Sequence, residues 1–162
     1  MYDPDATGVG VQPYAYDNLC APNAPFGAYL VYGSKIKIYP HQESATFKIM
    51  RMTVAPIRDT SPSYIEFEDL SQIPGHRTIV NKSEDQQRTC LSAYASTAKV
   101  CQCDINDVEC QALYNAVPSR PWFWYFQIDT QDSSGYDNVP MTFDVQITYY
   151  CKLIRTQNVN ES

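Results

Sequence analysis

Apolar and polar residues alternate along the stretch "MTFDVQITYYCKLI", residues 141–154. A two-residue period places successive side chains on opposite sides of an extended backbone, so the pattern predicts a long β-strand. One side of this strand carries Met141, Phe143, Val145, Ile147, Tyr149, Cys151 and Leu153. The other side carries Thr142, Asp144, Gln146 and Thr148. A chain that contains such a strand needs a sheet with one apolar face, and this favours an all-β fold.

A second stretch, "PWFWYFQIDT" (residues 121–130), is rich in aromatic residues. In an extended conformation one face carries Trp122, Trp124, Phe126 and Ile128, and the other carries Phe123 and Tyr125. Both faces then need an apolar covering. The stretch therefore predicts either a central strand or an interface.

Earlier segments also have strand character. In "AYLVYGSKIKIYP" (28–40) the apolar side includes Ile36 and Ile38, and Lys35 and Lys37 take the other side. "TFKIMRMTVAPI" (46–57) changes its apolar phase, as a bulge or burial on both sides would produce. "HRTIV" and "RTCLSAYA" predict two brief strands, "YIEFEDLSQIPG" a short helix or turn, and "STAKVCQCDINDVECQALYNAV" a partly helical loop.

The composition agrees with one β-rich domain. The 162 residues include 44% hydrophobic and only 19% charged residues, with 13 tyrosines and 11 prolines, which disfavours a helical bundle. We expect a single jelly-roll β-sandwich over residues 1–162, with an extended segment at 1–27 and a long surface loop at 90–118. No apolar run is long enough for a transmembrane helix, so we expect no membrane insertion. A net charge of −6 argues against binding nucleic acid by bulk charge alone.

Four motifs resemble the capsid proteins of small circular single-stranded DNA viruses that encode a replication initiator. They are "QPYAYDNL" (12–19), "AYLVYGSKIKI" (28–38), "RPWFWYFQI" (120–128) and "FDVQITYYCKLI" (143–154). The resemblance implies a virion protein that assembles in the host nucleus or cytoplasm. It also implies an icosahedral homo-oligomeric shell, of about 60 copies, around a single-stranded DNA genome. The host receptor is unknown.

The chain departs from that family at its start. Members usually carry an Arg- and Lys-rich arm and a first strand before the Gln-Pro segment, whereas only "MYDPDATGVGV" precedes Gln12. DNA binding would then use a missing arm or another molecule. The candidate basic patch facing the lumen consists of Lys35, Lys37, Lys48 and Arg51. Solvated strand faces are the alternative interpretation of these residues.

Catalytic and cofactor motifs are not evident. His41 and His76 stand outside any paired metal-ligand or hydrolase motif, and "GVG" at residues 8–10 lacks the strand and helix of a phosphate loop. The acidic residues of "CDINDVEC" lack the spacing of a calcium loop. We expect a protein that is not an enzyme and needs no cofactor.

Four of the six cysteines, Cys90, Cys101, Cys103 and Cys110, fall within the expected surface loop. Their spacing does not match the usual zinc knuckles. At least one disulfide among them would stabilise a loop with few core contacts, and free thiols remain the alternative.

The pattern also predicts the core and the interface. Ile36, Ile38, Trp124, Phe126, Val145 and Ile147 are expected between two sheets. Surplus aromatic surface at Trp122, Trp124, Phe126, Tyr149 and Tyr150 is expected in the core or in contacts between copies. A lectin-like jelly roll or a secreted, disulfide-stapled interaction domain are the alternative functions. A lectin would present such aromatics in exposed positions.

Overall fold

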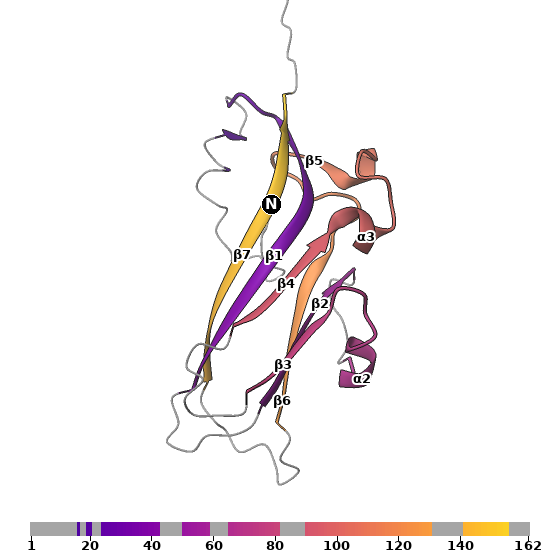
Figure 1. Ribbon diagram of the computed structural model, residues 1–162. Helices are drawn as coiled ribbons and strands as arrows, with labels where there is room; N and C mark the ends of the chain where they lie inside the picture. The colour runs from indigo at the N-terminus through magenta and orange to yellow at the C-terminus, as the bar shows by residue number, and fades with distance from the viewer. Residues whose placement is uncertain are drawn as a thin grey trace, which may run out of the picture. The chain divides into compact units, whose positions relative to one another are not determined.

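The structure, a computed structural model, describes Tyr16, Leu19, Cys20 and residues 24–42, 50–58, 65–81, 90–130 and 141–155 (Figure 1). The strands are β1 (Ala28–Gln42), β2 (Met50–Ile57), β3 (Arg77–Asn81), β4 (Leu91–Ser96), β5 (Gln111–Leu113), β6 (Phe123–Thr130) and β7 (Met141–Ile154). Short helices α2 (Phe67–Leu70), α3 (Thr97–Cys101) and η1 (Val108–Cys110) connect them. The predicted all-β class is confirmed.

The strands form two antiparallel sheets. In the first sheet, β1 pairs with β4, β5 and β7, and in the second, β2 pairs with β3 and β6. The β2–β6 register runs from Met50 opposite Thr130 to Ile57 opposite Phe123. β1 therefore lies inside its sheet, and β6 and β7 each pair with one strand among those described.

The chain divides into two compact units. The first comprises residues 1–34, 96–122 and 149–162, and the second comprises residues 35–95 and 123–148. β1 and β7 each pass from one unit into the other because the boundaries fall within these strands.

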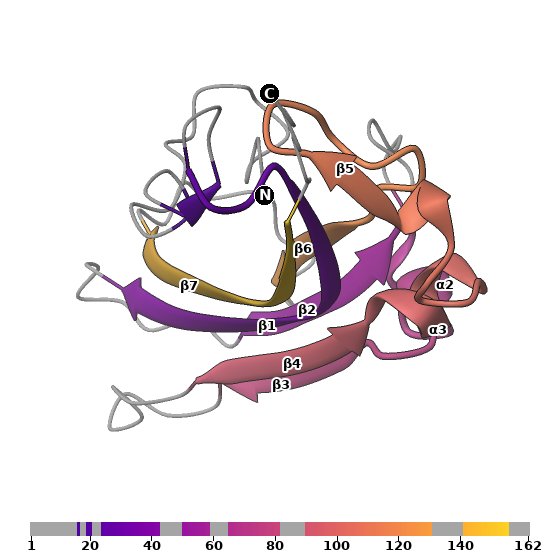
Figure 2. The same ribbon diagram turned by 90° about the horizontal axis from the view of Figure 1, so that it is seen from above.

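The core of the second unit is sandwiched between its two sheets. Figure 2 shows β1 and β4 in one layer and β2 and β3 in the other. The buried members are Ile36, Ile38, Met52, Val54, Leu91 and Ala93. Ile79, Trp124, Phe126, Ile128 and Phe143 pack around them and remain partly exposed. Alternate residues of β1, β2, β4 and β6, together with Ile79 of β3 and Phe143 of β7, therefore form one apolar layer, as period-two patterning predicts.

The first unit has a separate core built around tyrosines. Tyr16 packs edge-on against Tyr29, with ring centroids 5.3 Å apart, and Cys20 and Ala112 complete the buried cluster. The Tyr16 hydroxyl donates to the Tyr114 carbonyl at 2.7 Å, and the Tyr29 hydroxyl donates to the Ala116 carbonyl at 2.8 Å. These bonds satisfy polar groups that burial would otherwise leave unpaired.

Several local predictions are corrected. β6 begins at Phe123, so Trp122 precedes the strand, and β6 is an edge rather than a central strand among the described residues. Residues 91–96 form β4, whose buried Leu91 belongs to the core, so the surface loop begins only after this strand. The phase change before β2 falls at residues 43–49, outside the described residues. Within β2 itself, both sides are buried, as at Met52 and Thr53.

Candidate assembly edge and cysteine cluster

The second unit has one side where β6 and β7 meet. The Phe126 ring on β6 packs edge-on against the Phe143 ring on β7, with centroids 5.3 Å apart. β6 pairs with β2 and β7 pairs with β1, and no described strand takes their other edges. We call this surface, formed by residues 123–130 and 141–148, the β6–β7 edge.

Two apolar residues of this edge are not covered. Val145 and Ile147 follow the alternation of Phe143 and thus lie on its side of β7, yet their exposed fractions are 54% and 37%. The prediction that both are buried is wrong, because β7 is an edge strand and no described strand lies beyond it. The same prediction is confirmed for Ile36 and Ile38, whereas Trp124 and Phe126 are half-buried against the core.

The β6–β7 edge lacks the usual protection of an exposed strand. Natural edge strands are often guarded by lysine, proline or inward-pointing charges. Residues 142–148 contain a single charged side chain, Asp144, whose Oδ2 lies 2.8 Å from His41 Nε2 on β1. The Asp144 side chain lies on the side of β7 opposite Val145 and Ile147. Within the part of the chain that the structure describes, the edge is therefore open to pairing with another strand.

The structure does not gather the predicted basic residues into one patch. Lys35 and Lys37 are half-buried on the face of β1 opposite Ile36 and Ile38. Arg51 lies on the outer face of the other sheet, because its neighbour Met52 points into the shared core. Lys48 lies outside the described residues.

Arg51 already has two partners within its own unit. Its Nη2 donates to Asp129 Oδ2 at 2.6 Å, and its guanidinium lies 3.2 Å from the centroid of the Phe67 ring. Arg51 and Asp129 are opposite each other in the β2–β6 register, where opposite charges stabilise a sheet. The separate segments gave no sign of this pairing, since only the register brings them together. Of the predicted basic residues, Lys35 and Lys37 remain together.

The predicted aromatic residues have different surroundings. Trp122 is half-buried, and its indole N–H donates to the Thr97 hydroxyl at 3.0 Å. That hydroxyl in turn donates to the Val31 carbonyl at 2.6 Å. Tyr150 lies beside Tyr32, with ring centroids 6.1 Å apart, and is 36% exposed. Tyr149 is half-buried. An exposed tryptophan platform of the kind a sugar would stack on is not formed by Trp122 or Trp124.

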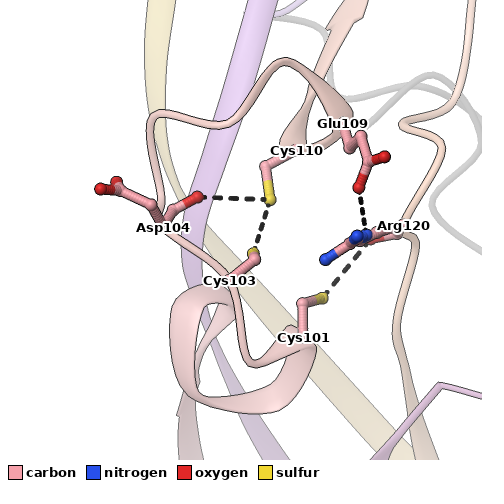
Figure 3. A network of polar contacts seen from close by, with 6 residues as sticks. All are labelled: Cys101, Cys103, Asp104, Glu109, Cys110 and Arg120. Atoms are coloured by element: carbon pink, nitrogen blue, oxygen red, sulfur yellow. Dashed lines mark hydrogen bonds and ion pairs between the residues drawn. The ribbon is translucent and has the colours of Figure 1, made fainter.

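Three of the four predicted loop cysteines lie close together in the first unit (Figure 3). The Sγ atoms of Cys103 and Cys110 are 2.9 Å apart, and the Cys101 thiol donates to the Arg120 carbonyl at 3.5 Å. All six cysteines, including Cys90, are free thiols in the structure. The disulfide expected from the sequence therefore stays a prediction. Among the candidate cysteines, the short distance between sulfurs favours Cys103 and Cys110 as its two partners.

Burial shapes the chemistry of this cluster. Cys101 and Cys110 are each 2% exposed, whereas Cys103 is half-buried. Burial, followed by the neighbouring Cys103 thiol, raises the pKa of Cys110 to about 12. Cys110 is therefore a protonated thiol at neutral pH. Elsewhere, burial raises the pKa of Cys151 to about 11.

Other classes of site find little support in the described part of the chain. No group of three or more His, Cys, Asp or Glu residues there is arranged to hold a metal ion. His41 contacts Asp144, and His76 Nδ1 lies 2.9 Å from the Ile73 carbonyl oxygen. Among the same residues, no helix has both the length and the apolar character needed to cross a membrane.

Comparison of the chain with protein-family models, with curated proteins and with solved structures finds no match.

Proposed function

We propose that this chain is a viral capsid protein that assembles through its β6–β7 edge into a closed shell around a single-stranded DNA genome. The exposure of Val145 and Ile147 carries the proposal. These side chains share the alternation of the core residue Phe143, so they are placed for burial under a further layer. The occupant we propose is a second copy of this chain.

Three features support self-association over a ligand site. The edge is apolar and extended, and it offers main-chain groups along a strand, which suits strand-to-strand contacts. Its two charged side chains, Asp129 and Asp144, are engaged by Arg51 and His41, and it carries no lysine or glutamate that would repel a second copy. The resemblance to capsid proteins provides a reason for many such contacts, because a closed shell needs extensive permanent interfaces.

The DNA-binding part of the proposal depends on Lys35 and Lys37. They lie on the face of β1 away from the core, so this face would turn toward the lumen. Arg51 is excluded from this role because Asp129 and Phe67 already engage it. Nucleic acid that copurifies with the particles would be detected by ultraviolet absorbance.

Sedimentation velocity and negative-stain microscopy of the purified chain test the assembly. Closed particles are expected for the wild type, and Val145→Lys should shift the population toward monomers, because strand pairing would bury the new charge. Val117→Lys is the matched control, since Val117 is also 54% exposed and lies outside the edge. Far-UV circular dichroism of both variants verifies folding.

A wild-type chain that stays monomeric at micromolar concentration would contradict the proposal. Equal loss of assembly in the Val117→Lys and Val145→Lys variants would also contradict it, because the β6–β7 edge would then have no special role.

A further inference from the structure

We propose that Cys103 and Cys110 form a reversible disulfide that closes the loop between them, by exchange with a small-molecule disulfide such as oxidised glutathione. Their Sγ atoms lie 2.9 Å apart as free thiols, so little movement is needed to form the bond. The inference is independent of the proposed assembly, because it concerns contacts within the first unit.

The backbone between the two cysteines is already folded into successive turns. The Asp107 amide donates to the Asp104 carbonyl at 3.0 Å, and the Cys110 amide donates to the Asp107 carbonyl at 3.0 Å. The Asp104 carboxylate accepts from the Asn106 amide at 2.9 Å. These bonds bring the ends of the loop together without a covalent link, so oxidation would retain an existing conformation.

Both ends of the loop are attached to neighbouring segments, and Figure 3 shows the contact of Glu109 with Arg120 at one of them. The Cys103 amide donates to the Ala98 carbonyl of α3 at 3.2 Å. At the other end, the Arg120 amide donates to the Glu109 carbonyl at 3.2 Å, and the Arg120 and Glu109 side chains form an ion pair. The two sulfurs are therefore held near each other by contacts that do not involve them.

Cys101 is the less suitable partner although it is nearby. The Cys101 side chain is buried, and its thiol points toward Arg120, to whose carbonyl it donates, rather than toward the Cys103–Cys110 pair (Figure 3). Cys103 is half-buried and is the member of the pair that solvent reaches. An oxidant would thus meet Cys103 first.

The exchange has two steps. The Cys103 thiolate attacks one sulfur of the small-molecule disulfide, which forms a mixed disulfide and releases one thiolate. Cys110 then attacks the Cys103 sulfur, and the second small thiol leaves with the Cys110 proton. The protein loses two electrons and two protons, and one small-molecule disulfide becomes two thiols. Reduced glutathione in excess reverses the sequence.

Thiol counting and peptide mapping of the folded chain test the proposal. After treatment with oxidised glutathione, removal of the reagent and alkylation, the free thiols should fall from six to four. The intact mass of the chain before alkylation should drop by about 2 Da. Cleavage after Glu109 with a glutamyl endopeptidase separates Cys103 from Cys110, so the two peptides should stay linked until reduction.

Single variants identify the partners. Cys103→Ser and Cys110→Ser should each abolish the bridge, whereas Cys101→Ser, the matched control, should keep it. The wild-type mapping requires no variant, so a variant that fails to fold leaves the test intact.

Other outcomes would overturn the proposal. These are six thiols that persist in oxidised glutathione, a glutathione adduct on Cys103 that never resolves, a bridge that maps to Cys101, or stoichiometric zinc that protects the thiols.

Discussion

The long strands β1 and β7 have the same kind of alternating sequence and belong to the same sheet, but their apolar residues have different surroundings. In β1, Ile36 and Ile38 are 3% and 0% exposed. In β7, Val145 and Ile147 are 54% and 37% exposed. β1 has strand neighbours in the sheet and faces β2 across the core, whereas β7 pairs with β1 alone among the described strands.

This difference shows that alternation specifies the side of a strand on which a residue lies but not whether that side is covered. Apolar surface is stabilising only where another element removes it from water. For Ile36 and Ile38 of β1, the covering element is β2 of the facing sheet. In β7 it is absent from the described residues, and a second copy supplies it under the proposed function.

The largest expected effect compares one residue from each strand. Ile38→Ala should lower the free energy of unfolding by about 2–5 kcal/mol, because it leaves a cavity in a fully buried site. Val145→Ala should change it by less than about 1 kcal/mol in the dissociated chain, since Val145 is already half in water. Urea denaturation followed by tryptophan fluorescence measures both. Equal costs would mean that Val145 is covered within the monomer.

An intermediate effect is expected where β6 meets β7. Phe126→Ala should cost about 2 kcal/mol, less than a fully buried phenylalanine, because the side chain is half-buried against the core. A double-mutant cycle with Phe143→Ala should give a coupling of about 0.5–1.5 kcal/mol from the edge-on ring contact. A coupling near zero would argue against the facing arrangement of the two strands.

The smallest effect is expected on the outer face of the β1–β7 pair. Asp144→Asn should cost less than about 1 kcal/mol, because the His41 and Asp144 side chains are 50% and 80% exposed. Asp129→Asn is the comparison, since Arg51 and Asp129 are less exposed, at 27% and 41%, and Arg51 is also stacked on Phe67. It should cost more than Asp144→Asn in the same unfolding assay. The reverse order would mean that the exposed pair has a larger role than its solvation suggests.

Much of the secondary structure was predictable from local patterns. The alternation in residues 141–154 and 28–40 identified β7 and β1, and the aromatic run identified β6. Local patterns were less informative where contacts between distant residues decide the outcome. Arg51 looked like a free basic residue until the β2–β6 register placed Asp129 opposite it. The pairing of Cys103 with Cys110 rather than Cys101 likewise depends on the turns between them.

The sequence by itself determined which side chains share a face of each strand, because the two-residue period is a property of the extended backbone alone. It also determined the number of cysteines available for the loop. Only the tertiary structure decided which faces are covered, since coverage depends on strand order, and strand order depends on pairings between residues far apart in the chain. For that reason the same alternation gives a buried Ile38 in β1 and an exposed Val145 in β7.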